Sequence, residues 1–99
     1  MIRNREEILS VIRDHRENIR SFGVHRLGLF GSYASGNEHE ASDLDFIVEF
    51  DQNTFDAYMG LKLFLEDLFK CKIDLVLSSS IKPRLRSTIL GQTVYAQGL

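Results

Sequence analysis

The sequence has little of what several large protein classes need. Its 99 residues include one cysteine, Cys71, which excludes an internal disulfide framework and a zinc site built from cysteines. No apolar run approaches the roughly 20 residues of a membrane-spanning helix, and residues 1–7 lack the apolar stretch of a signal peptide. We therefore expect a cytoplasmic protein, in a compartment that keeps thiols reduced, without contact with a membrane.

The chain also lacks a strong charge of one sign. Its net charge of −2 argues against a protein that binds nucleic acid directly, because such proteins are usually basic. A hydrophobic share of 43% and a charged share of 26% are ordinary for a globular protein. A chain of this length buries about 60–65% of its unfolded surface, which allows one modest core. We therefore expect residues 1–99 to form a single domain.

Several common catalytic motifs are absent as well. The sequence has no G-x-x-x-x-G-K-[ST] loop, and its glycines are not spaced as G-x-G-x-x-G. Ser32 does not lie in a G-x-S-x-G nucleophile elbow. The three histidines do not cluster, and we interpret Cys71 as a small buried apolar residue. These absences exclude a phosphate-binding P-loop, a dinucleotide fingerprint and a serine-hydrolase site.

The pattern of apolar residues, glycines and capping residues predicts an α/β (α+β) fold, in which a small mixed sheet is flanked by helices. Asn4 and Glu7 have the spacing of a capping box and open the first helix. Pro83 suits the first turn of the last helix, which Gly91 ends. The predicted order is helix 5–20, strand 24–30, short helix 32–35, strand 43–50, helix 55–70, strand 73–77 and the last helix. Residues 78–80 are expected to form a loop, and residues 93–95 a short extended tail.

A glycine–serine turn follows the first predicted strand. Gly31 ends the apolar stretch 27–30 and lets the backbone turn sharply and approach a ligand closely. Ser32 would begin the short helix that Gly36 closes. Free N–H groups at such a helix start favour an anion, and the serine hydroxyl adds a further donor. The turn therefore predicts a cradle for phosphate.

Three aspartates lie in the strands that follow. Asp43 and Asp45 are two residues apart in the second strand, so they share a face and lie roughly 7 Å apart at the backbone. Asp74 lies between two apolar residues and can join them if the third strand pairs beside the second. Carboxylates gathered at one edge repel one another unless metal ions neutralise them, and Mg²⁺ prefers carboxylate oxygens together with phosphates. The pattern predicts a divalent-metal site that handles a nucleoside triphosphate.

The turn and the aspartates together resemble a known signature. Gly31-Ser32, ten further residues, and then Asp43-Leu44-Asp45 resemble the motif of the polymerase-beta-like nucleotidyltransferase superfamily. The length and the ending of the chain resemble the minimal nucleotidyltransferase (MNT) family, the antitoxins of HEPN/MNT toxin–antitoxin pairs. Residues 72–76 resemble the family's third-carboxylate strand and residues 81–90 its closing helix, so the resemblance covers roughly residues 22–95. One departure is Ser35, where many members carry arginine.

This resemblance implies a polymerase-beta-like nucleotidyltransferase fold and an enzyme that uses ATP. The enzyme would transfer AMP to a tyrosine hydroxyl of a partner HEPN ribonuclease toxin, neutralise it, and form a hetero-oligomer with it. By the same resemblance, Asp43 and Asp45 would bind two Mg²⁺ ions, and Asp74 would bind the catalytic ion and help to activate the attacking hydroxyl. Gly31 and Ser32 would hold the β- and γ-phosphates.

Other readings stay open at this point. The helix 55–70 is apolar almost all round, which favours burial on more than one side and a partner surface. An antitoxin that acts by binding alone, without catalysis, is therefore an alternative. A small-molecule nucleotidyltransferase that resembles the aminoglycoside-modifying enzymes is another, although the chain has no room for an acceptor domain. Lys82, Arg84 and Arg86 either form a solvated face or contact nucleotide phosphates or the partner.

Overall fold

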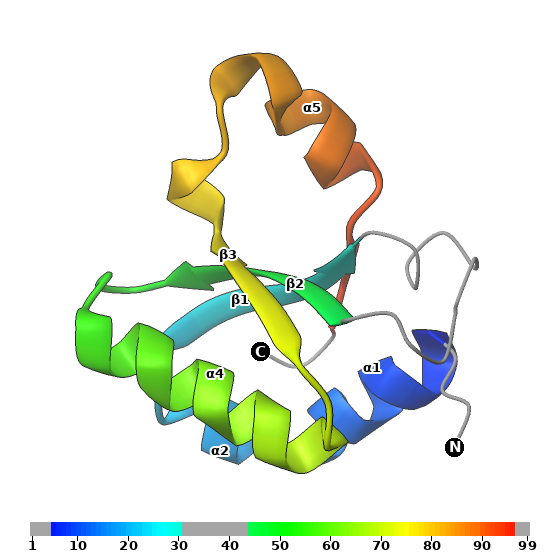
Figure 1. Ribbon diagram of the computed structural model, residues 1–99, viewed down its shortest axis with the longest axis vertical. Coiled ribbons are helices and arrows are strands. Elements are labelled where there is room, and N and C mark those ends of the chain that lie inside the picture. The colour runs from blue at the N-terminus through cyan, green and yellow to red at the C-terminus, as the bar shows by residue number, and fades with distance from the viewer. Residues whose placement is uncertain (1–4, 31–43, 97–99) are drawn as a thin grey trace.

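A computed structural model describes residues 5–30 and 44–96 of the chain. Within these ranges four strands form one sheet in the order β3–β2–β1–β4. Helices α1, α2 and α4 cover one face of the sheet, and α5 lies on the other side (Figure 1). The elements are α1 (Arg5–Asp14), α2 (Arg16–Arg20), β1 (Val24–Phe30), β2 (Leu44–Phe50), α4 (Phe55–Phe69), β3 (Ile73–Leu77), a 3₁₀ turn (Ser78–Ser80), α5 (Pro83–Gly91) and β4 (Val94–Tyr95).

The sheet is mixed, as the sequence predicts. Strand β1 pairs antiparallel with β2 and with β4. Strands β2 and β3 pair in parallel, and α4 forms the crossover between them. The predicted extended tail is thus a strand of its own, because Val94 and Tyr95 lie opposite Leu29 and Gly28. The short helix predicted at 32–35 lies outside the described residues.

The core lies between the sheet and the three helices on one face. Alternate residues of β2 point into it, which is the period of a strand with one buried face. From the helices, every third or fourth residue does the same. Each fully buried aliphatic or aromatic side chain contributes about 1.5–3 kcal/mol to folding. The central members are Ile8, Ile12, Ile19, Leu27, Leu29, Leu44, Phe46, Val48, Leu61, Leu65, Phe69, Ile73 and Leu75.

The predicted single helix 5–20 is wrong in one respect, because it is two helices that meet at His15. The backbone of His15 has φ −108° and ψ 20°, outside the helical region, and its N–H is shared between the carbonyls of Val11 and Ile12. The imidazole Nδ1 also lies 2.9 Å from the Val11 carbonyl oxygen. No glycine or proline marks this break. The turn that follows α2 lies at Gly23, whose φ of +84° favours glycine.

Helix α4 matches its prediction within one residue at its end. Thr54 caps its start, since the Thr54 hydroxyl accepts a hydrogen bond from the Ala57 N–H at 3.1 Å. It ends at Lys70, which adopts the left-handed conformation with φ 56° and ψ 38°. Strand β3 has the predicted bounds. None of the described helices is long and apolar enough to cross a membrane.

The region after β3 differs from the prediction in two details. Residues 78–80 form a 3₁₀ turn in place of a loop. Helix α5 begins at Pro83 as predicted, but none of its residues is buried. Ile81 is buried just before the helix starts, and Leu85 remains 46% exposed. The apolar spacing of Ile81, Leu85 and Ile89 therefore does not form a buried helix face, because Ile81 lies outside the helix.

Candidate functional site

Two of the three predicted aspartates lie side by side on neighbouring strands. Asp45 in β2 is the direct partner of Asp74 in β3, in the parallel pairing. Partners in a sheet share a face. Their neighbours in the chain are buried in the core beneath the sheet, so both carboxylates project from the opposite face. Asp45 is half-buried and Asp74 is exposed. The structure thus brings together acids that are far apart in the chain.

The other predicted site residues lie outside the described part of the chain. These are Asp43, Gly31 and Ser32. Their neighbours in sequence are placed, however. Phe30, which precedes Gly31, lies directly opposite Asp45 across the antiparallel pair. Leu44, which follows Asp43, begins β2. The described segments therefore end at the same end of β1 and β2, beside Asp45 and its partner Asp74.

The two carboxylates fit the oxygen ligands that a divalent cation such as Mg²⁺ prefers. Within residues 5–30 and 44–96, no three acidic, histidine or cysteine side chains gather as a metal site. Two of the three predicted ligands belong to that range, and they lie on one face at paired positions. The residues present are therefore suited to part of a metal site, to which Asp43 would add the third carboxylate.

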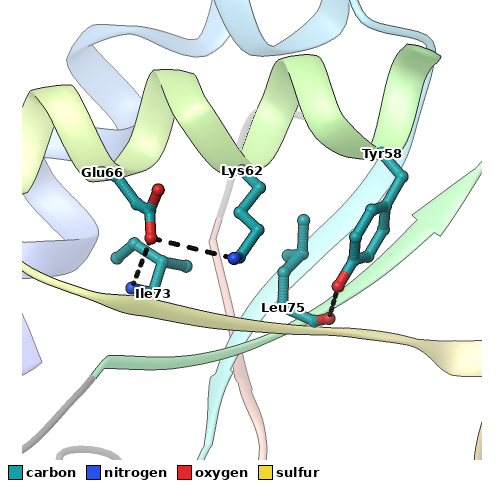
Figure 2. Close-up of polar contacts among 5 residues, drawn as sticks. All are labelled: Tyr58, Lys62, Glu66, Ile73 and Leu75. Atoms are coloured by element: carbon teal, nitrogen blue, oxygen red, sulfur yellow. Dashed lines mark hydrogen bonds and ion pairs between the residues drawn. The ribbon is translucent and has the colours of Figure 1, made fainter. Parts of the chain in front are cut away.

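Two side chains of α4 contact β3 on either side of Asp74, and the sequence analysis did not identify them. The Tyr58 hydroxyl donates to the Leu75 carbonyl oxygen at 2.6 Å. The Glu66 Oε2 accepts from the Ile73 N–H at 3.4 Å and lies 3.9 Å from the Lys62 Nζ (Figure 2). The signal in the sequence is a row of hydrogen-bonding groups four residues apart, Tyr58, Lys62 and Glu66, in an otherwise apolar helix.

The three basic residues at the last helix differ in their surroundings, and the contact of Arg86 corresponds to neither reading from the sequence. Arg86 donates to the Ser78 carbonyl oxygen at 2.7 Å and to the Ser78 hydroxyl at 3.4 Å, so it links α5 to the 3₁₀ turn. Lys82 and Arg84 are exposed. Arg86 also lines a cavity of about 270 Å³ with Glu49 and Asn53. This cavity adjoins the far ends of β2 and β3, away from Asp45 and Asp74.

Comparison with known proteins agrees with this arrangement. The family model described as "Nucleotidyltransferase domain" matches residues 12–96. "Protein adenylyltransferase MntA" of Thermococcus cleftensis is 38% identical over 92 residues, which cover 91% of this chain and 93% of that protein. The match includes nearly the whole length of both proteins.

Solved structures show the same fold. One of a candidate minimal nucleotidyltransferase superposes with a TM-score of 0.72 at 36% identity, over 87% of this chain and 93% of that one. A tri-AMPylated HEPN toxin of Shewanella oneidensis in complex with MNT antitoxin matches with a TM-score of 0.64. That match has 20% identity over 92% of this chain and 73% of the other, so it supports a similar fold and nothing more. The predicted fold is confirmed, and the chain belongs to the nucleotidyltransferase domain family as an enzyme of that class.

Proposed function

We propose that this enzyme transfers AMP from ATP to a tyrosine hydroxyl of a partner HEPN-family toxin and thereby neutralises the toxin. The observation that carries the proposal is the pairing of Asp45 with Asp74 on one face of the sheet. The name of the Thermococcus relative, a protein adenylyltransferase, supports a protein as acceptor. The AMPylated HEPN toxin bound to an MNT antitoxin supports the class of partner. The cytoplasmic location stays a prediction.

The reaction is a displacement at the α-phosphorus of ATP. The acceptor oxygen forms a bond to this phosphorus, and the bond from phosphorus to the oxygen that bridges to the β-phosphate breaks. Pyrophosphate leaves with the bonding electrons, and the hydroxyl proton passes to a base or to solvent. Catalysis of this kind depends on positioning and on charge stabilisation more than on covalent chemistry.

In this proposal the predicted residues bind either the metal or the phosphates. Asp43, Asp45 and Asp74 would hold Mg²⁺, with two ions expected, and Asp74 would also help to activate the acceptor hydroxyl. Gly31 and Ser32 hold the β- and γ-phosphates through backbone N–H groups and the serine hydroxyl. Bound Mg²⁺ supplies positive charge that offsets the charge of the triphosphate. The exposure of Asp74 leaves that carboxylate open to a protein acceptor.

The test is transfer of label from ATP that carries ³²P at the α-phosphate to a purified HEPN-family protein, with Mg²⁺ present. We expect labelled partner, with the label on tyrosine by mass spectrometry. Asp45→Asn and Asp74→Asn should each lower the rate at least about 100-fold, a loss of about 2.7 kcal/mol in transition-state stabilisation. Glu49→Gln is the matched control, because Glu49 is also a half-buried acid and lies further along β2. Equal labelling by Asp45→Asn and wild type would reject the proposal.

A second function is favoured by the apolar surface. Phe55 and Leu63 of α4 are 76% and 58% exposed, although the helix buries its other side in the core. Such side chains suit a protein interface, so neutralisation by binding alone is the alternative. In that case Asp45→Asn would still protect cells from the toxin. Loss of protection by a variant that still forms the complex would reject the alternative.

A further inference from the structure

The strand that carries Asp74 lies at the edge of the sheet. Strand β3 has β2 as its neighbour on one side, and the order of strands places no other strand beside it among the described residues. The Leu44 N–H donates to the Lys72 carbonyl oxygen at 3.3 Å, and this bond determines which residues of β3 direct their backbone groups at β2. Alternate residues of such a strand direct their N–H and C=O groups to the same side. Asp74 therefore directs its backbone groups at β2, and Ile73 and Leu75 direct theirs away from it.

Helix α4 supplies partners to these outward groups. The Ile73 N–H donates to Glu66 at 3.4 Å, and the Leu75 carbonyl accepts from the Tyr58 hydroxyl at 2.6 Å. Figure 2 shows both side chains reaching from the helix to the strand, with Lys62 between them. Lys62 and Glu66 have side chains that are each 29% exposed, so this pair is largely covered. The two bonds are made by the residues directly before and after Asp74.

We propose that Tyr58 and Glu66 are positioning residues that hold Asp74 in line with Asp45. A five-residue edge strand with one neighbouring strand is prone to local opening, which would change the separation of the two carboxylates. A functional constellation tolerates displacements of only about 0.5 Å. Groups that hydrogen-bond a ligating side chain typically change metal affinity or activity by about 10–100-fold when they are removed, and for Tyr58 and Glu66, which bond the backbone on either side of Asp74, we expect the lower end of that range. The inference rests on the proposed function, because it assigns Asp74 as a metal ligand.

The first test uses protein without metal. Tyr58→Phe removes one hydroxyl and keeps the ring. We expect the Asp74 amide to exchange with deuterium about 10-fold faster, while the amides of β1 keep their rates. Thr93→Val is the matched control, since it removes a similar bond, from the Thr93 hydroxyl to the Ile89 carbonyl oxygen at 2.7 Å. An unchanged rate at Asp74 in Tyr58→Phe would overturn the inference.

The second test separates positioning from stability alone. Binding of Mn²⁺ is followed by electron paramagnetic resonance in wild type, Tyr58→Phe and Thr93→Val. We expect about 10-fold weaker binding for Tyr58→Phe and no change for Thr93→Val. Glu66→Gln keeps an oxygen acceptor for the Ile73 N–H and should bind as wild type, whereas Glu66→Ala should bind more weakly. If Tyr58→Phe does not fold, the comparison of Glu66→Gln with Glu66→Ala still tests whether these contacts position Asp74.

The outcomes distinguish the inference from the function on which it rests. If Tyr58→Phe and Glu66→Ala bind Mn²⁺ as tightly as wild type, the two residues only stabilise the edge of the sheet, and the inference is wrong. If Asp74→Asn binds Mn²⁺ as wild type, or wild type binds none, the assignment of Asp74 as a ligand fails first. Weaker Mn²⁺ binding in both Asp74→Asn and Tyr58→Phe supports the assignment of Asp74 as a ligand and the positioning role of Tyr58.

Discussion

Replacement of Gly28 by alanine should destabilise the protein through one added methyl group. Gly28 is buried in β1 and lies opposite Tyr95 of β4. A Cβ at this position would lie 3.0 Å and 3.2 Å from two ring carbons of Tyr95, and closer still to the Thr93 methyl group. The Thr93 side chain and the Tyr95 ring would have to shift, which would also disturb the Arg26 guanidinium that lies 3.9 Å from the centre of that ring.

The expected cost follows from this overlap. Overpacking of this kind costs about 1–3 kcal/mol. Taking a middle value of about 2 kcal/mol, the melting temperature of a domain this small should fall by roughly 8–16 °C. Thermal and urea unfolding followed by circular dichroism would measure both quantities. The urea m-value should stay the same, because the change acts on the folded state.

Two further variants make this prediction specific. Gly91→Ala is the control, because nothing lies within 4 Å of a Cβ at that helix end, and its stability should hold or rise by up to about 1 kcal/mol. In the Gly28→Ala/Thr93→Ser double variant, the colliding methyl is gone, and about half of the loss should be recovered. If Gly28→Ala melts within about 2 °C of wild type, or if Thr93→Ser gives no recovery, the Thr93 and Tyr95 side chains do not pack against Gly28 as described.

Three other substitutions test the local structure of α4. Thr54→Ala should cost about 0.5–2 kcal/mol through the lost cap on the Ala57 N–H, and Thr54→Ser should recover most of it, by urea unfolding. Lys70→Gly should raise stability by up to about 1 kcal/mol, because glycine accepts the left-handed backbone; lower stability would mean that the exposed bond to Asp67 matters more. Leu65→Ala, which empties a fully buried site, should cost about 2–5 kcal/mol, and a cost below about 1 kcal/mol would contradict its place in the core.

Much of the fold could be predicted because the patterns are local. Strand β3 is a short apolar stretch interrupted only by Asp74, and its bounds follow from that stretch and the flanking polar residues Lys72 and Ser78. The start of α4 follows from the capping threonine, and the turn at Gly23 follows from the backbone freedom of glycine. The candidate site could be predicted in part for the same reason, since alternation places Asp45 and Asp74 away from the core.

The parts that could not be predicted depend on tertiary contacts. The break at His15 has no glycine or proline, and the sharing of its N–H between two carbonyls is visible only in the structure. Leu85 and Ile89 have the spacing of one helix face, but α5 buries none of its residues and Leu85 remains exposed. Tyr58 and Glu66 gain their place beside Asp74 from the docking of α4 against an edge strand, which no local pattern specifies.

Because β2 and β3 pair in parallel, the pair of carboxylates depends on a long stretch of chain and is sensitive to truncation. Strands β1 and β2 can pair as a hairpin, but Asp74 reaches Asp45 only after the chain has closed over the whole of α4. A fragment that stops short of residue 73 would lose the pair of carboxylates even if the hairpin survived. A ligand held by both acids would therefore stabilise only chains that keep both strands in place, and the share of the unfolding transition that it moves to higher temperature would report the fraction of such molecules in a preparation.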